Sequence, residues 1–192
     1  MRRIGELWWP PERTGLRTPY LAALVAGRPT PPFARVAAYS MLVGAGTACL
    51  MLLMDNILFA GVSLPRIRST ATLPLWLRAI IPVYAAVTEE IIYRLGVMTV
   101  VVWIATLVFR RPAVSPPAAA VWLGIAVAAV LFGLAHVANV PDAPHPILRA
   151  VTLNGVAGIV LGWVYWKRGF EAAVLAHFGA DVSIYLGAAS VL

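Results

Sequence analysis

Long apolar runs separated by short polar segments form the pattern of this chain. No charged side chain occurs in 36–54, 112–140 or 150–166, and Asp181 is the single charged residue in 172–192. Each of the first three runs approaches or exceeds the ~17–25 residues that a helix needs to cross a bilayer. We expect helices over about 36–60, 75–109, 116–138, 147–166 and 170–191. The pattern therefore predicts an all-α fold, a polytopic transmembrane bundle of about five to six helices.

The composition agrees with a membrane location. Hydrophobic residues make up 61% of the 192 residues and charged residues only 12%, whereas a soluble domain carries about 25% charged residues. The first 35 residues differ from the rest because they are rich in proline and contain six of the fifteen basic residues. We therefore expect two parts, a basic and irregular N-terminal tail over 1–35 and a transmembrane helical domain over 36–192.

The distribution of Lys and Arg predicts the orientation of the helices. If 75–109 crosses the membrane once and the tail is cytoplasmic, ten basic residues fall inside and the loop over 140–146 falls outside, with Arg66 and Arg68 as exceptions. The net charge is +7, and we expect the basic residues to interact with anionic lipids of the bilayer. We do not expect them to bind nucleic acid, because they are not grouped with aromatic residues on a polar surface. We expect a multi-pass integral protein of the cell (plasma) membrane with a cytoplasmic N-terminus.

Three charged residues interrupt the helix predicted over 75–109. Glu89, Glu90 and Arg94 have apolar sequence on both sides. An ionised side chain at the middle of a membrane helix costs about 2.5–3.5 kcal/mol, so this group costs roughly 7–10 kcal/mol if it faces lipid. The segment must therefore face polar groups from elsewhere in the chain. By contrast, Asp55 and Asn56 follow the first apolar run, and we expect them to form a cap at the membrane interface.

A spacing of four residues recurs among the ionisable residues of the apolar helices. His177 and Asp181 are four residues apart, as are Glu90 and Arg94, and His136 follows a long apolar run. Residues four apart lie on one face of a helix, so these groups can converge inside a bundle, sheltered from lipid. Taken singly, each has a structural alternative: an ion pair for Glu90, an interfacial histidine for His136, and a bracing pair for His177. Their joint occurrence favours a functional site.

The residue types in this set suit the hydrolysis of an amide bond. A carboxylate beside an imidazole can hold and deprotonate a water molecule, which then becomes the nucleophile. A second imidazole and a further proton donor can stabilise the oxyanion of the tetrahedral intermediate. Two histidines with carboxylates are also compatible with zinc, but the HExxH spacing is absent. We expect no cofactor, and zinc is possible but not required.

Three motifs in order resemble the signatures of a known family. Glu89-Glu90-x-x-x-Arg94, Phe132-x-x-x-His136 and His177-x-x-x-Asp181 look like those of the CPBP family. These are the intramembrane proteases of the CAAX-processing and bacteriocin-self-immunity group, which includes the Ras-converting CAAX endopeptidase. Any one motif is weak, but three in order, each within an apolar helix, are specific. The resemblance covers about 75–190.

The resemblance implies a membrane-embedded endopeptidase of glutamic type that cleaves near the end of a membrane-associated protein or peptide. The residues implied for each role are Glu89 and His136 for activation of the water, Glu90 and Arg94 for shape and charge balance, and His177 and Asp181 for the oxyanion. An ionised Asp cannot donate a hydrogen bond, so Asp181 must either be protonated or orient His177.

Two other classes of function are compatible with the same residues. A non-catalytic immunity or scaffold module would use the pocket to bind a partner, and its function would survive Glu89→Gln. A proton-coupled transporter would use the buried carboxylates as relays. The sequence shows no internal repeat and no pair of matching broken helices, which argues against a transporter.

Overall fold

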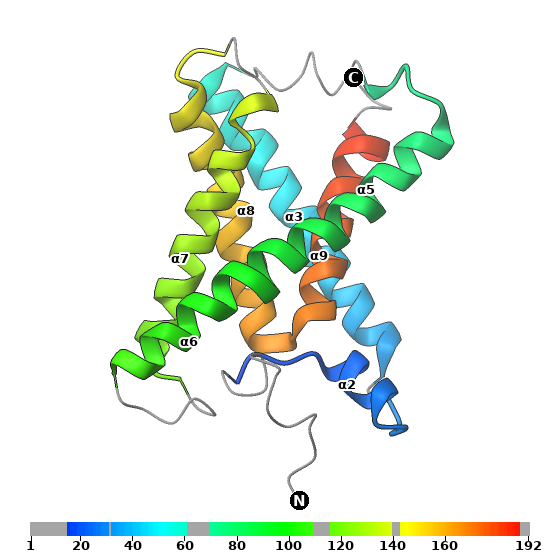
Figure 1. The fold of residues 1–192 in the computed structure, drawn as a ribbon. Helices are drawn as coiled ribbons and strands as arrows, with labels where there is room; N and C mark the ends of the chain where they lie inside the picture. Colours follow the sequence, from blue (N-terminus) through cyan, green and yellow to red (C-terminus); the bar gives the residue numbers. More distant parts are fainter. Residues whose placement is uncertain (1–14, 31, 61–69, 110–115, 140–142, 189–192) are drawn as a thin grey trace, which may run out of the picture.

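The computed structural model of the chain is a helical bundle (Figure 1). It describes residues 15–30, 32–60, 70–109, 116–139 and 143–188, and within these ranges every regular element is a helix. The elements are α2 (Pro19–Val25), α3 (Phe33–Phe59), α5 (Leu75–Glu90), η2 (Ile91–Met98), α6 (Thr99–Val108), α7 (Ala118–Ala135), η3 (Val137–Asn139), α8 (Pro146–Arg168), α9 (Phe170–Val182) and η4 (Ser183–Ala188). Among the described residues, four helical segments are long and apolar enough to cross a membrane. The predicted all-α transmembrane bundle is confirmed.

The elements α5, η2 and α6 form one continuous helical segment of 34 residues, Leu75–Val108. This segment crosses the bundle obliquely (Figure 1), in agreement with the single crossing expected over 75–109. The π-helical turn η2 begins directly after Glu90, and such turns are frequent at functional sites. The hydroxyl of Thr99 donates to the carbonyl oxygen of Arg94 at 2.8 Å, so a side chain supports the widened turn around Arg94.

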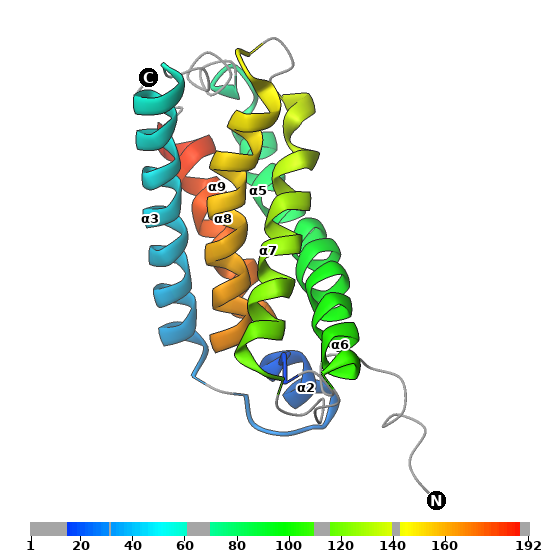
Figure 2. The same ribbon diagram turned by 90° about the vertical axis from the view of Figure 1, so that its left-hand side faces the viewer.

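The helices run between two ends of the bundle (Figures 1 and 2). The α2 end holds α2, the start of α3, the end of α6, the start of α7 and the turn between α8 and α9. The far end holds the end of α3, the start of α5, η3, the start of α8 and η4. Helix α7 packs against α8, and α3 packs against α9.

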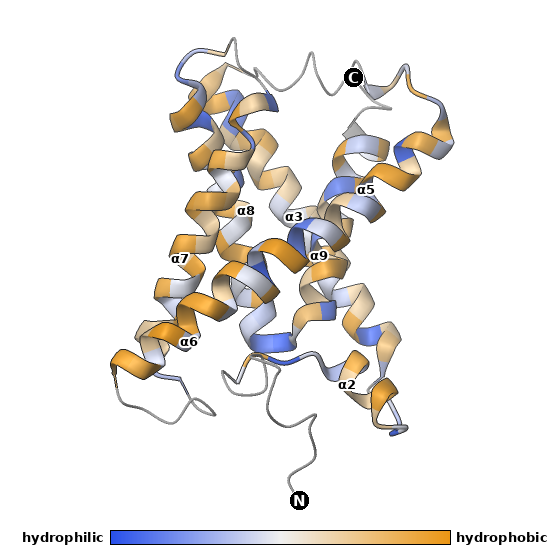
Figure 3. Cartoon of the chain, in the orientation of Figure 1, coloured by the Kyte–Doolittle hydropathy of each residue, from blue (hydrophilic) through white to orange (hydrophobic). Residues whose placement is uncertain are grey.

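The outer surface of the bundle is apolar. Figure 3 shows hydrophobic ribbon over most of the helices, with hydrophilic residues where α5 passes into η2 and on α9. Large apolar side chains such as Leu42, Ile57 and Val108 are 73%, 68% and 73% exposed. Surfaces of this kind are unfavourable in water and suited to lipid. Inside the bundle, small residues bring helices together, since a Cβ at Gly158 would lie 2.7 Å from the Cα of Ala129.

A matched pair of glycines on α3 tests this packing. A Cβ at Gly44 would overlap the carbonyl group of Ala176 on α9, whereas a Cβ at Gly46 would meet nothing within 4 Å. We expect Gly44→Ala to lower the free energy of unfolding by about 1–3 kcal/mol, because α3 and α9 must separate. Gly46→Ala should leave it unchanged or raise it by roughly 0.5–1 kcal/mol. Unfolding in detergent micelles measures both, and equal values for the two variants would contradict the proposed contact.

Asp55 does not form the interfacial cap expected from the sequence. Its side chain is 2% exposed, and Nε of Arg149 on α8 donates to its Oδ1 at 2.8 Å. The expectation was wrong because the partner lies 94 residues away and belongs to another helix. A buried carboxylate without such a partner would be strongly destabilising. Asn56, the next residue, is exposed.

Part of the N-terminal tail is ordered and packed on the bundle, which differs from the irregular tail expected over 1–35. Helix α2 forms within it, and Leu16 is fully buried. The backbone N–H groups of Tyr20 and Leu21 donate to the carboxylate of Glu171 on α9, at 3.0 and 2.7 Å. A carboxylate satisfies the free N–H groups at the start of a helix and interacts favourably with its dipole. Residues 1–14, the loop with Arg66 and Arg68, and 110–115 lie outside the described residues.

Candidate active site

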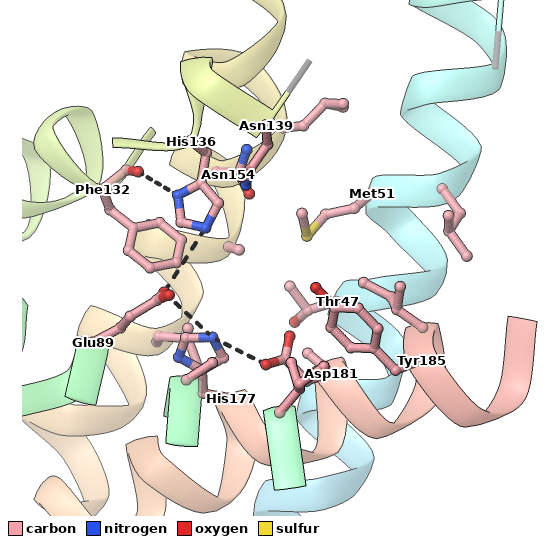
Figure 4. A pocket seen from close by; sticks show the side chains of 18 of the residues that line it. Thr47, Met51, Glu89, Phe132, His136, Asn139, Asn154, His177, Asp181 and Tyr185 are labelled. Carbon is pink, nitrogen blue, oxygen red and sulfur yellow. Dashed lines mark hydrogen bonds and ion pairs between the residues drawn. The ribbon is translucent and has the colours of Figure 1, made fainter. Parts of the chain in front are cut away.

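A pocket of about 340 Å³ lies between α3, α5, α7, α8 and α9 (Figure 4). Four of the predicted site residues line it: Glu89, His136, His177 and Asp181. The volume falls at the lower end of the ~300–1,000 Å³ of small-ligand pockets. The four side chains come from α5, from the residue directly after α7, and from α9, so three separate motifs of the sequence meet in one cavity.

Glu90 and Arg94 lie behind this pocket and are fully buried. Nε of Arg94 is 3.1 Å from Oε2 of Glu90. A terminal nitrogen of Arg94 donates to the carbonyl oxygen of Gly158 at 3.3 Å, and the guanidinium carbon lies 5.0 Å from the centre of the Phe132 ring. The expected ion pair is present and is shielded from lipid. Buried pairs of this kind depend on such additional contacts to offset their desolvation.

Glu90 also connects this ion pair to His177 on α9. Its Oε1 is 2.9 Å from Nδ1 of the imidazole. An ionised carboxylate only accepts hydrogen bonds, so Nδ1 of His177 carries the hydrogen. The other ring nitrogen, Nε2, lies 3.8 Å from Oδ2 of Asp181 and 3.8 Å from Oε2 of Glu89. Glu90 and Arg94 therefore orient His177 from behind, and its Nε2 faces the pocket.

His136 is held by the end of its own helix. Helix α7 ends at Ala135, which leaves the last carbonyl groups of the helix without a backbone donor. Nδ1 of His136 lies 2.7 Å from one of these, the carbonyl oxygen of Phe132. A carbonyl oxygen only accepts, so Nδ1 carries the hydrogen and the neutral ring has its lone pair on Nε2. This lone pair is directed toward Glu89 (Figure 4).

The carboxylate of Glu89 lies between the two imidazoles. Its Oε2 is 3.8 Å from Nε2 of His136 and 3.8 Å from Nε2 of His177, and it has no hydrogen-bond partner among the described residues. The distance is longer than a hydrogen bond, and two acceptors cannot bond directly to each other. A water molecule that donates one O–H to Glu89 and one to His136 satisfies both.

Metal binding was the other chemistry that the sequence left open. In the part of the chain that the structure describes, no group of three or more His, Cys, Asp and Glu side chains is placed to hold a metal ion.

Asp181 lies beside Nε2 of His177, where its carboxyl group is 15% exposed. All six residues predicted from the sequence thus belong to one connected cluster.

The sequence did not identify the polar residues between this cluster and the far end. Asn139, Arg149 and Asn154 line the same pocket. Arg149 offered a signal, because a lone cation at the start of an apolar helix needs a partner, although the sequence did not identify which residue that is. The two asparagines were not singled out: Asn139 follows the end of an apolar helix, and Asn154 is an uncharged residue within one.

The fold and the cluster together define an integral membrane protein whose helices enclose acidic and imidazole side chains around a pocket. A family model described as type II CAAX prenyl endopeptidase, Rce1-like, matches residues 70–183. The chain therefore belongs to this family of CAAX-type intramembrane proteases. The matched range contains all six predicted site residues, from Glu89 to Asp181. No curated protein and no solved structure matches the chain.

Proposed function

We propose that this protein is an intramembrane endopeptidase of glutamic type, which hydrolyses a peptide bond near the end of a membrane-associated protein or peptide. The observation that carries the proposal is the position of Oε2 of Glu89, 3.8 Å from Nε2 of both His136 and His177. The match to a peptidase family supports it. The proposed substrate is a peptide, because the cluster suits proton transfer and oxyanion binding at a carbonyl group.

In the proposed reaction, Glu89 and His136 hold the attacking water and one of them takes its proton. The water oxygen forms a bond to the carbonyl carbon of the scissile amide, and the carbonyl oxygen becomes an oxyanion. When the C–N bond breaks, the leaving nitrogen receives a proton from Glu89 or His136, and the carboxylic acid product leaves. General acid–base catalysis of this kind contributes about 10²–10⁴-fold to a rate.

His177 is the proposed donor to the oxyanion. Its Nδ1 is engaged by Glu90, so the protonated ring has one further N–H, on Nε2, directed into the pocket. Three carboxylates, those of Glu89, Glu90 and Asp181, lie at 3.8, 2.9 and 3.8 Å from the nitrogens of this ring, so a ring with hydrogen on both nitrogens has an acceptor for each. Asp181 then orients the ring, or donates if protonated. Glu90 and Arg94 are positioning residues.

We further propose that the protein lies in the cell membrane with its N-terminus in the cytoplasm. The exposed Lys and Arg side chains of the described residues all lie at the α2 end: Arg17, Arg28, Arg35, Lys167 and Arg168. Cytoplasmic segments of membrane proteins carry an excess of such residues, which anionic lipids attract.

A histidine pair on the same chain tests the catalytic assignment. His136 lines the pocket, whereas His145 is exposed and outside it. We expect His136→Ala to lower the rate of cleavage of a membrane-anchored peptide about 100-fold or more, because a proton acceptor is lost. His145→Ala should leave the rate unchanged. Mass spectrometry of the products in detergent or liposomes measures both, and full activity of His136→Ala would refute its role.

Metal removal tests the proposed absence of a cofactor. We expect cleavage to continue after exhaustive treatment with a chelator, because the water is held and deprotonated by side chains alone. Elemental analysis of the purified protein should find less than one zinc ion per chain. Loss of activity on chelation, restored by added zinc, would replace the glutamic mechanism with a metal-dependent one.

A further inference from the structure

The π turn η2 sets the direction of the two buried charges behind the pocket. Along this part of the chain every fourth residue is buried: Pro82, Ala86, Glu90, Arg94 and Met98. On an α-helix of 3.6 residues per turn, each step of four residues rotates the side chain by roughly 40° beyond a full turn, so such a row would drift out of the bundle. A π turn contains more residues per turn, because its hydrogen bonds join residues five apart. The turn therefore keeps Glu90 and Arg94 on the inward face.

Thr99 closes this turn. Its backbone N–H and its hydroxyl both donate to the carbonyl oxygen of Arg94, five residues earlier, the hydroxyl at 2.8 Å. A threonine of an ordinary helix bonds to a carbonyl three or four residues earlier, as Thr106 does to Trp103 at 2.7 Å. Because a bond across five residues matches the π turn, the hydroxyl of Thr99 holds the backbone that carries Arg94.

Tyr165 on α8 holds Thr99 from a neighbouring helix. The two hydroxyl oxygens are 3.0 Å apart, and both side chains have no exposed surface. Thr99 uses its one hydroxyl hydrogen for the carbonyl oxygen of Arg94, so Tyr165 is the donor of this bond. The guanidinium of Arg94 also donates to α8, at the carbonyl oxygen of Gly158. Helix α8 thus fixes Arg94 twice, through its backbone and through its side chain.

Two further contacts connect this pair of hydroxyls to the pocket. Nε of Arg94 is 3.1 Å from Glu90, and Glu90 is 2.9 Å from Nδ1 of His177. Neither Thr99 nor Tyr165 is among the residues that line the pocket. They can therefore act on a reaction there only through the placement of Arg94, Glu90 and His177.

We infer that Thr99 and Tyr165 are positioning residues for the proposed peptide hydrolysis, which hold the π turn so that Glu90 and Arg94 face His177. This inference rests on the proposed function, because it assigns residues to the same site. A displaced Glu90 would release the imidazole, and Nε2 of His177 would no longer be directed at the oxyanion. Substrate binding depends on the lining of the pocket, so the loss should fall on kcat and not on KM.

Two buried threonines of α6 provide a matched test. Thr99→Val and Thr106→Val each remove a fully buried hydroxyl and keep the branched shape. We expect Thr99→Val to lower kcat for a membrane-anchored peptide roughly 10–100-fold, as small misplacements of catalytic groups do. Thr106→Val should leave kcat unchanged, and Thr99→Ser, which keeps the hydroxyl, should recover most of the rate. Tyr165→Phe should lower kcat alone but have no further effect in Thr99→Val, because the tyrosine acts through Thr99.

The Nδ1–H group of His177 gives a readout that does not require cleavage. Proton–nitrogen correlation NMR in detergent micelles follows this signal, which is assigned by its absence in His177→Gln. We expect Thr99→Val and Tyr165→Phe to shift it or to speed its exchange with water, and Thr106→Val to leave it in place. If Thr99→Val does not accumulate, Tyr165→Phe carries the measurement, since it removes one oxygen atom and adds no group.

Equal effects of Thr99→Val and Thr106→Val, on kcat or on this signal, would overturn the inference and leave only a contribution to packing. An unchanged signal in both Thr99→Val and Tyr165→Phe would also overturn it. A protein that cleaves no peptide but shows the expected change in the signal would refute the proposed function, while the placement of His177 by Thr99 and Tyr165 would stand.

Discussion

Glu89→Gln is expected to abolish peptide cleavage while leaving the protein folded. Glutamine has nearly the same shape as glutamate, but it cannot accept a proton and it presents an N–H₂ group where the water should donate. We expect a loss of about 10⁴-fold in kcat/KM, at the upper end of general acid–base effects, because one group both holds and deprotonates the nucleophile. Single-turnover cleavage of a membrane-anchored peptide is the measurement.

Stability distinguishes a catalytic role of Glu89 from a structural one. Its Oε2 makes no hydrogen bond with the described residues, and its side chain is 28% exposed. The free energy of unfolding of Glu89→Gln should therefore stay within about 0.5 kcal/mol of the unmodified chain, as for other substitutions outside the packed core. Retention of biological function by this variant would instead favour a module that binds a partner without hydrolysis.

Arg94→Met is expected to destabilise the folded bundle strongly. The side chain of Arg94 is fully buried, and it faces Glu90, which is also fully buried. Removal of one member of a buried ion pair leaves the other charge uncompensated and costs about 3–5 kcal/mol. Unfolding in detergent should require less denaturant, and the amount of protein inserted in the membrane should fall. Arg28→Met, at an exposed position of the α2 end, is the matched control and should have no effect.

A double substitution shows whether the cost arises from the unpaired charge. In Glu90→Gln/Arg94→Met no ionised group of the pair remains, so the double variant should be more stable than Arg94→Met alone. Cleavage by the double variant should still be impaired, because His177 loses the carboxylate that accepts from its Nδ1. If the double variant is the less stable of the two, Glu90 stabilises the fold through a partner other than Arg94, such as His177, and the ion-pair account is wrong.

Helical segments were predictable because a continuous run of apolar residues is enough to specify a helix that can cross a membrane. The apolar run that contains Glu89 reads as one helix, and it folds as one from Leu75 to Val108. Glu90 and Arg94 were predictable as a pair for a related reason, since a spacing of four brings them together within a single helix. The motifs that carried the family resemblance are local in the same sense, and the family match confirms the resemblance.

Contacts between distant helices were not predictable in this way. Asp55 was interpreted as an interfacial cap, and its true partner is Arg149 on α8. The segment around Leu16 was interpreted as irregular, yet it completes the core because Glu171 accepts from the first N–H groups of α2. In both cases the energy comes from an interaction across the bundle, and nothing in the neighbouring sequence encodes its partner.

The sequence by itself determined that the chain is a membrane helix bundle and that charged groups within it need polar partners. It also identified the six residues that are candidates for these interactions. Only the tertiary structure decided that one carboxylate oxygen of Glu89 lies between two imidazole nitrogens, and that Glu90 stands behind the site and not in it. The physical reason is that spacing along a helix defines which residues share a face, while the rotation of each helix against its neighbours depends on packing of small residues such as Gly44 and Gly158 throughout the bundle.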